Sequence, residues 1–340
     1  MGDTVIEIIA GGDIDKNKVV EFGKYPIYAN SHSGDGIVGY YDDFYRVNGP
    51  AVTVTGRGEV GFAKARETDF TPVVRLLAIR SKHNHCFLEN AINLHGVTVE
   101  STGVPQLTVP QLSAYRIYFP YDIQEENQIG TFFSTLDQQI TLHQRKLDKL
   151  KSVKQAYLSE MFPAEGERVP KRRFPGFTDD WELRKLGEVV YRSNLISSSK
   201  DLPRLEFEDI NSGLGTLNKD ISQKLDDRKG LEFNVGDVLF GKLRPYLKNW
   251  WYAEFKGIAL GDFWNLKSDL WHSCFLYTYI QSNSFQLVAN DTSGTKMPRS
   301  DWNLVAESIA KFPSLPEQKA IGSFFSTLDQ HITLHQRKSI

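Results

Sequence analysis

Cysteine is scarce in this sequence. Only Cys86 and Cys274 occur among 340 residues, and we assign neither to a CxxC motif or to a Cys/His cluster. We therefore expect neither a disulfide framework nor a zinc site, and reduced thiols are typical of the cytoplasm.

Long apolar runs are also lacking, because no segment approaches the roughly 20 apolar residues that a membrane helix needs. The start, MGDTVIEIIAGGD, has no basic stretch followed by an apolar core, so a signal peptide is not expected either. We predict a cytoplasmic protein without membrane association.

An excess of positive charge is absent as well. The 40 Lys and Arg residues are balanced by 42 Asp and Glu residues, and the net charge is −2. A uniformly basic surface of the kind common in nucleic-acid-binding domains is therefore excluded. If this chain binds DNA, its basic side chains must be gathered into local patches.

Catalytic signatures are missing too. The sequence contains no NPP[FY], HExxH or GxSxG motif, and we expect no dinucleotide-binding GxGxxG turn after a strand. The segment 236–242 has the GxxxxGK spacing of a P-loop, but Leu243 replaces the Ser or Thr that would hold magnesium. Pro245 follows where a helix should be starting. We expect no catalytic residue in this chain, and no cofactor or metal bound by it.

A near-identical internal repeat organises the chain. GTFFSTLDQQITLHQRK (130–146) and GSFFSTLDQHITLHQRK (322–338) differ at two of 17 positions and are offset by 192 residues. Self-similarity of this kind indicates a duplicated unit. The segments between the copies are very different. The predicted plan is a variable domain, a constant helix, a second variable domain and a second constant helix.

The constant segments have coiled-coil spacing. Mostly apolar residues recur at alternating steps of four and three along 129–161 and again along 321–335. We predict two long helices that pair with each other as an antiparallel coiled coil, with a pseudo-twofold relation that comes from the repeat. His143 and His335 fall in the seam, as polar residues that fix the register or, alternatively, as metal ligands. The predicted pairing residues are Phe133, Leu136, Ile140, Leu147, Leu150, Phe325, Leu328 and Ile332.

The variable segments are predicted to be mixed α/β domains with short strands. Strands are expected within 51–65 and over 73–80, and a helix over 275–290. Residues 163–181 are rich in Pro, Gly and charge without a period, which indicates a linker. Its basic run, Lys171 to Arg173, is either a solvated loop or a phosphate contact. The predicted boundaries are 1–122 for the first domain, 123–162 for the central helix, 163–181 for the linker, 182–314 for the second domain and 315–340 for the second helix.

Each variable domain contains a stretch that mixes basic and aromatic residues. Arg and Lys reach phosphates and the edge of guanine, Asn reads adenine, and Tyr offers a flat face with a polar tip. The alternative for the tyrosines is a place in the core. The candidate DNA-binding residues are Tyr28, Asn30, His32, Arg57, Lys64 and Arg66 in the first domain, and Lys242, Arg244, Tyr246, Lys248, Lys296 and Arg299 in the second.

Several segments are similar to the specificity (S) subunits of type I restriction–modification enzymes. They are GKYPIYANSHSGDGIVGYYD and TVTGRGEVGFA in the first domain, LEFNVGDVLFGKLRPYLKN and SGTKMPRSD in the second, and FPSLPEQKAIGSFFSTLD and LDKLKSVKQAYLSEMFP at the helices. The resemblance covers essentially the whole chain. Unlike the family pattern, no lead-in similar to RFPGFTDDWELRKLGE (173–188) precedes the first domain, and the second helix is shortened.

The resemblance implies a fold of two target-recognition domains, each reading one half of a bipartite double-stranded DNA site, with helices that set the spacing. It also implies partners. Two methyltransferase (M) subunits would bring S-adenosylmethionine, and restriction (R) subunits would bring ATP- and magnesium-dependent translocation and cleavage. The chain itself would be non-catalytic. The alternative function is a coiled-coil scaffold or protein-interaction module without DNA sequence specificity, which salt-dependent DNA binding would distinguish.

Overall fold

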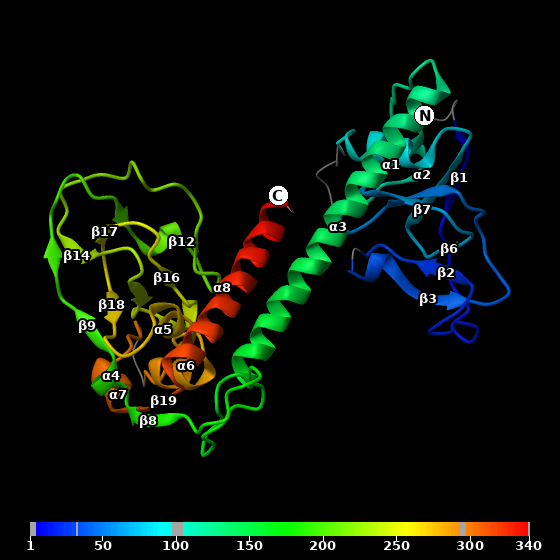
Figure 1. The fold of residues 1–340 in the computed structure, drawn as a ribbon. Helices are drawn as coiled ribbons and strands as arrows, with labels where there is room; N and C mark the ends of the chain where they lie inside the picture. The colour runs from blue at the N-terminus through cyan, green and yellow to red at the C-terminus, as the bar shows by residue number, and fades with distance from the viewer. Residues whose placement is uncertain (1–4, 32, 97–104, 293–296, 339–340) are drawn as a thin grey trace. The chain divides into compact units, whose positions relative to one another are not determined.

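The computed structural model describes residues 5–31, 33–96, 105–292 and 297–338. The chain forms two compact units, an N-terminal unit of residues 1–141 and a C-terminal unit of residues 142–340. Their boundary falls inside the long helix α3 (Ile123–Glu160). Both units combine sheets and helices (Figure 1), so the predicted mixed α/β class is confirmed. Within the described ranges, no helix has both the length and the apolar character needed to cross a membrane.

Two sheets form the N-terminal unit. One has four antiparallel strands, in the order β1 (Val5–Ala10), β7 (Leu76–Ser81), β4 (Ala51–Thr55) and β5 (Ala63–Arg66). The other has three strands, in the order β3 (Ile37–Tyr41), β2 (Tyr25–Tyr28) and β6 (Thr71–Pro72), with the 3-10 turn η1 (Ser33–Gly36) before β3. β4 reads AVTVT, and its β-branched residues suit a pleated strand. All five of its residues are buried.

Helices α1 (His85–Asn93) and α2 (Val109–Ser113) complete the core of this unit. Alternate residues of β4, Val52 and Val54, pack together with Leu88 of α1 and Leu112 of α2. This follows from the two-residue period of a strand, which directs every second side chain to the same face. Asn84 caps α1, because its side-chain oxygen accepts a hydrogen bond from the Phe87 N–H over 2.9 Å.

The C-terminal unit contains several small sheets. Its central sheet has the order β16 (Trp250–Tyr252), β15 (Val238–Gly241), β18 (Phe263–Lys267) and β9 (Tyr191–Ser193). A second sheet has the order β10 (Ile196–Ser197), β14 (Gly230–Phe233), β17 (Gly257–Ala259) and β11 (Arg204–Leu205). Two-stranded pairs are formed by β12 (Ile210–Asn211) with β13 (Thr216–Leu217), and by β19 (Ile309–Phe312) with β8 (Glu182–Lys185).

The helices of the C-terminal unit surround its main core. They are α4 (Leu186–Val189), α5 (Ser273–Tyr279), α6 (Asn283–Ala289), α7 (Trp302–Glu307) and α8 (Leu315–Lys338), with the 3-10 turns η2 (Phe207–Asp209) and η3 (Pro245–Leu247). The single helix predicted over 275–290 is therefore wrong. The chain breaks at Ser282, whose hydroxyl accepts a hydrogen bond from the Phe285 N–H and starts a new helix.

The segment 163–181, predicted to be a linker, is tied to the C-terminal unit. Trp181 is buried and contacts Phe162 and Phe275 in the main core. Arg173 forms a bidentate ion pair with Glu317, with Nε–Oε1 and Nη2–Oε2 both 2.7 Å. The composition of this segment predicted its irregular backbone but not its packing, because a single large aromatic residue is enough to anchor it.

Within the C-terminal unit, α8 runs antiparallel to the last turns of α3. His143 contacts His335, Lys154 pairs with Asp329, and Tyr157 packs on Phe324, so partner numbers fall as α3 advances. Figure 1 shows α8 beside this part of α3. The hydrophobic cluster between them contains Leu147, Leu328 and Ile332, with Leu150 and Tyr157 packed against it.

The remaining predicted pairing residues lie elsewhere. Phe325 is buried, but in the main core of the C-terminal unit beside Phe275. Phe133, Leu136 and Ile140 are exposed on α3. Among the contacts described between α8 and α3, the one nearest to the start of α3 joins His143 and His335. The heptad pattern alone cannot show where along a helix the pairing starts.

The two units use the same contact between a long helix and a short one. Gly130 of α3 lies against the start of α1, where an added Cβ would be 3.0 Å from the Phe87 nitrogen. Gly322 of α8 lies in the same way against α5, where an added Cβ would be 3.0 Å from the Phe275 nitrogen. The side chains four residues before each glycine, Glu126 and Gln318, also make equivalent contacts. Glu126 accepts a hydrogen bond from the Asn84 N–H, and Gln318 accepts one from the His272 N–H over 2.9 Å.

Candidate nucleic-acid interface

Two candidates of the N-terminal unit are buried. Arg66 donates hydrogen bonds to Asp35 and to the Thr53 hydroxyl, and its guanidinium lies 3.7 Å from the centre of the Tyr28 ring. Burial also raises the pKa of Tyr28, although the nearby Arg66 lowers it in part. Their polar groups are engaged inside the unit. Arg66 and Tyr28 are therefore structural residues of this fold, and we withdraw them as direct DNA contacts.

The other candidates of this unit are partly engaged. Asn30 bridges two backbone groups, because it donates to the Val74 carbonyl over 3.2 Å and accepts from the Gly56 N–H over 2.9 Å. Lys64 is half-exposed and lies 3.4 Å from Glu89. Arg57 is partly exposed and forms an isolated β-bridge with Gln106. His32 lies outside the described residues.

A glycine pattern in this unit needs a separate account. Residues 56–61 read GRGEVG and follow strand β4, which is the spacing of a dinucleotide-binding turn. A GxGxxG pattern thus does follow a strand, which corrects our expectation that none does. In the structure the segment is followed by strand β5, which pairs antiparallel with β4. It is thus a hairpin loop, and it does not lead into the helix N-terminus that binds a pyrophosphate in such folds. The P-loop-like segment 236–242 likewise contains strand β15.

The candidates of the C-terminal unit gather around the turn η3. Arg244 and Lys248 flank this turn, and both have left-handed backbone conformations with φ of 49° and 57°. Such conformations are strained for residues other than glycine and often mark functional sites. Backbone hydrogen bonds hold the turn at both ends. The Arg244 N–H donates to the Pro298 carbonyl over 2.7 Å, and the Gly213 N–H donates to the Lys248 carbonyl over 2.9 Å.

The side chains on this turn face outward. Arg244, Tyr246 and Lys248 are all exposed, and among the residues that the structure describes the Arg244 guanidinium has no ion-pair partner. Lys242 and Arg299 lie beside the turn, where both approach Asp262, at 3.4 and 2.9 Å. The structure thus brings together five of the six candidates of this unit, which we call the η3 surface. Lys296 lies outside the described residues.

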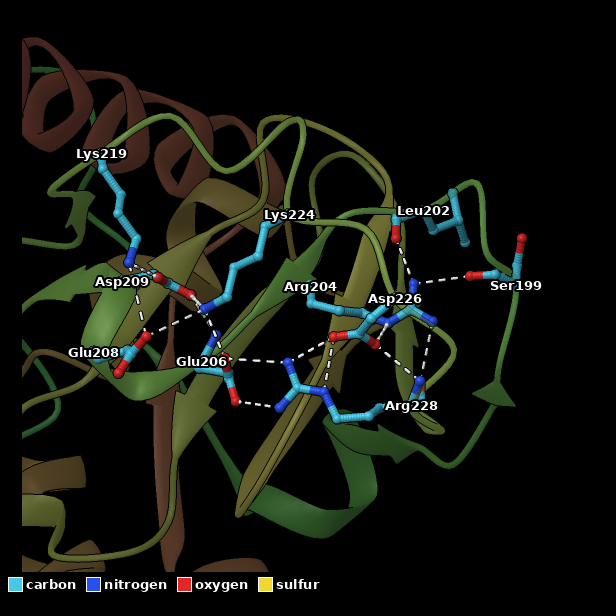
Figure 2. A network of polar contacts seen from close by, with 10 residues as sticks. All are labelled: Ser199, Leu202, Arg204, Glu206, Glu208, Asp209, Lys219, Lys224, Asp226 and Arg228. Atoms are coloured by element: carbon cyan, nitrogen blue, oxygen red, sulfur yellow. Dashed lines mark hydrogen bonds and ion pairs between the residues drawn. The ribbon is translucent and has the colours of Figure 1, made fainter.

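The C-terminal unit also contains a network of ion pairs around Glu206 (Figure 2), which we did not predict from the sequence. Lys224 lies 2.6 Å from Glu206 and 2.7 Å from the buried Asp209, and Arg228 lies 2.8 Å from Glu206. Hydrogen bonds from Arg228 and then Lys224 lower the pKa of Glu206. Burial acts to raise the pKa of Asp209, but bonds from Lys224 and Lys219 outweigh it and lower that pKa. The sequence signal of this network is a group of acids at 206, 208 and 209, followed by bases at 219, 224 and 228.

Replacing Lys224 tests the network. We expect Lys224→Met to lower the free energy of unfolding of the C-terminal unit by about 1.5–3 kcal/mol at neutral pH, since it removes hydrogen bonds to charged groups. Carboxyl groups with lowered pKa stabilise the fold above their unfolded pKa of about 4, and that contribution is lost as pH falls through the folded pKa. The difference between wild type and variant should therefore shrink in acid. Urea unfolding at several pH values measures it, and the exposed Lys219→Met is the milder control. A difference that stays constant down to acid pH would contradict the role given to the carboxylates.

A third polar group lies in the N-terminal unit. Glu67, His85 and Cys86 place one possible ligand atom each within 4.8 Å of the other two. His85 Nε2 lies 2.7 Å from Glu67 Oε1. We expected no metal site because we assigned neither cysteine to a Cys/His cluster, but His85 stands directly before Cys86. Glu67 could not have been assigned to them from spacing.

Comparison with known proteins shows what the chain is similar to. Residues 3–152 match the family model described as the type I restriction modification DNA specificity domain. The putative type I specificity subunit S.MpnORF507P of Mycoplasma pneumoniae is 30% identical over 141 residues, 40% of this chain and 37% of that protein. The type I restriction enzyme EcoDI specificity subunit of Escherichia coli is 22% identical over 350 residues, 92% of this chain and 77% of that protein.

A solved structure has the same fold. The S subunit of the type I restriction–modification system from M. genitalium superposes with a TM-score of 0.67 at 14% identity, covering 99% of this chain and 90% of that one. The matched part of this chain corresponds to little more than a third of the M. pneumoniae relative, but the fold match extends over both units. The resemblance indicated by the sequence is confirmed, because residues 3–152 match the DNA specificity domain of type I restriction–modification systems and the EcoDI specificity subunit is similar over 92% of this chain.

Proposed function

We propose that this chain is the DNA-reading subunit of a type I restriction–modification enzyme and that it recognises a two-part site, one part with each unit. The observation that carries the proposal is the match of residues 3–152 to a DNA specificity domain. Net charge gives no support, because it is −2. The proposal therefore requires local basic surfaces, and the η3 surface has the required character.

The η3 surface is suited to contact a DNA duplex. Rigid presentation matters because ordering a loop during binding costs free energy, and the backbone bonds at Arg244 and Lys248 hold this turn in place. An exposed guanidinium can bind guanine O6 and N7 or a phosphate. Tyr246 adds a flat exposed face next to it. We infer that Arg244 is the principal base or phosphate contact, with Lys242, Lys248 and Arg299 beside it.

The proposal assigns chemistry to partner subunits. S-adenosylmethionine would be bound by two M subunits, and ATP and magnesium by R subunits. The paired part of α3 and α8 is the proposed docking region for the M subunits. We further propose that a pseudo-twofold axis passes between His143 and His335, because these residues occupy the same place in the repeat and contact each other, with 3.2 Å between their Nδ1 atoms.

A methylome tests the function. The chain is expressed with its M subunit in a host that lacks other methyltransferases, and modified bases are mapped. We expect one two-part motif with a fixed spacer, and no methyl transfer by the purified chain alone. A motif without two parts would contradict the assignment of one half-site to each unit. Methyl transfer without the M subunit would contradict the non-catalytic role. A methylome unaffected by the chain would favour the scaffold alternative.

Arg244→Ala should weaken DNA binding while it leaves the fold intact, because its side chain is exposed. If Arg244 contacts a guanine edge, its loss should cost about 1–3 kcal/mol and relax that position of the motif. If it contacts only phosphate, the slope of log K against log salt should fall by about one. Fluorescence anisotropy with a duplex carrying the mapped motif measures both. Arg184→Ala, at an exposed arginine of β8, is the matched control. Equal affinities of the two variants would place the η3 surface away from DNA.

A further inference from the structure

Glu67, His85 and Cys86 come from two elements that meet at one edge of the N-terminal unit. Glu67 follows strand β5, and His85 and Cys86 are the first two residues of α1. Their ligand atoms lie within 4.8 Å of one another. His85 and Cys86 are partly buried, whereas the Glu67 carboxylate is largely exposed and free to adjust. Around a zinc ion, ligand atoms at about 2.0–2.3 Å from the metal stand roughly 3–4 Å apart. The cluster therefore needs only a small closure to surround an ion.

The donor set selects the kind of metal. A thiolate, an imidazole and a carboxylate together offer sulfur, nitrogen and oxygen, which suits a borderline-soft ion such as Zn²⁺. Calcium and magnesium prefer oxygen ligands throughout. Three protein ligands leave a fourth tetrahedral position. Solvent or a further group from outside could fill it.

Contacts that do not involve the three proposed ligands hold the backbone of His85 and Cys86 in place. Asn84 caps α1 through the Phe87 N–H. The buried Glu126 accepts a hydrogen bond from the Asn84 N–H and lies 2.9 Å from His83 Nδ1. These contacts hold residues 83–87 against α3, while the ligand atoms of His85 and Cys86 lie within 4.8 Å of that of Glu67. Support of this kind, outside the ligands themselves, increases the affinity of metal sites.

The C-terminal unit contains the same construction with different side chains. Ser273 and Cys274 begin α5 as His85 and Cys86 begin α1, and Gly322 packs on α5 as Gly130 packs on α1. There, Ser273 and Cys274 both contact the Tyr252 hydroxyl, at 2.9 and 3.6 Å. A cysteine is thus present at the equivalent place in both units, but only the first has His and Glu beside it. In the part of the chain that the structure describes, no second group of three such ligands occurs.

We propose that Glu67, His85 and Cys86 bind one zinc ion per chain. The ion ties the end of β5 to the start of α1 and stabilises the N-terminal unit. This site is independent of the proposed DNA contacts, since none of its residues belongs to the candidate DNA-binding residues. It also revises our expectation from the sequence that the chain has no zinc site.

Cobalt binding tests the proposal, since Co²⁺ takes tetrahedral zinc sites and gives a strong charge-transfer band when a thiolate is a ligand. The full-length chain is stripped with a chelator and titrated with Co²⁺ and then Zn²⁺. We expect the band to saturate at one equivalent and to vanish on addition of zinc. Cys86→Ser should lose the band and Cys274→Ser should keep it. His85→Ser, which copies the C-terminal unit, should weaken binding by roughly tenfold or more.

A second measurement covers the case in which Cys86→Ser does not fold. In the wild-type chain, zinc should slow the alkylation of Cys86 by iodoacetamide and leave the rate at Cys274 unchanged, as read by mass spectrometry of peptides. Zinc should also raise the melting temperature of the wild type and leave that of Cys86→Ser unchanged. Absence of the cobalt band in the wild type, a band that depends on Cys274, or equal alkylation of Cys86 with and without zinc would overturn the proposal.

Discussion

Phe325→Ala is expected to lower the free energy of unfolding of the C-terminal unit by roughly 3–5 kcal/mol, the cost of removing a buried phenylalanine from a core. Phe325 is 2% exposed and lies among aromatic residues of the main core. The repeat supplies a matched control. Phe133 occupies the equivalent place 192 residues earlier but is 38% exposed. Because less of the Phe133 side chain is buried, Phe133→Ala should lower the free energy of unfolding much less than Phe325→Ala does.

Urea unfolding of the two variants and of their combination measures this difference. Because the two side chains lie in different units, their effects should be additive. Equal losses at the two positions would mean that Phe133 is covered in the folded protein, and clear non-additivity would mean that the two phenylalanines share one cluster.

Arg173→Met should cost a similar amount, roughly 3–5 kcal/mol, because it leaves a buried carboxylate without its partner. The Glu317 side chain is 1% exposed, and that of Arg173 is 12% exposed. The neighbouring Arg172 makes a pair of the same 2.7 Å length with Glu160, but its side chain is 55% exposed. Exposed pairs contribute about 0–1 kcal/mol. Arg172→Met is therefore the control, with a much smaller expected loss.

The double variant Arg173→Met/Glu317→Leu separates the cost of the unpaired charge from the worth of the pair. With both charges removed, most of the stability should return, since apolar replacements of buried pairs are often neutral or stabilising. Chemical denaturation of all variants gives the comparison. A double variant as unstable as Arg173→Met would show that the pair itself, with its fixed geometry, stabilises the segment 163–181.

The long helices were the most predictable part of the fold. The repeat and the four-three spacing indicated helices over 123–162 and 315–340, and the structure has α3 and α8 over Ile123–Glu160 and Leu315–Lys338. Helix spacing is a local property of the sequence, and so it can be read directly. The extent of the seam is not local. Leu147, for example, is covered by Leu328 and Ile332, which lie more than 180 residues later in the sequence.

The candidate sites show the same limit. Arg66 and Arg244 are both arginines in basic, aromatic stretches, and nothing near either in the sequence distinguishes them. Arg66 is buried because Asp35, 31 residues earlier, meets its guanidinium, whereas Arg244 lies on a braced turn that directs it outward. Glu67 could not be joined to His85 and Cys86 from spacing either, because strand β7 intervenes between them. Residue type predicts the chemistry that a side chain offers, but only the fold decides its neighbours.

Gly130 and Gly322 lie near the start of the two long helices. Each glycine determines the position of the packed short helix along the long one. One turn further along α3 from Gly130 stands Ser134, and one turn further along α8 from Gly322 stands Ser326. A serine brings a Cβ where the short helix leaves no space for one. Sliding by a turn would therefore cause a clash, and smaller shifts would turn another side chain into the contact. Each long helix therefore accepts the short helix packed against it in a single axial register.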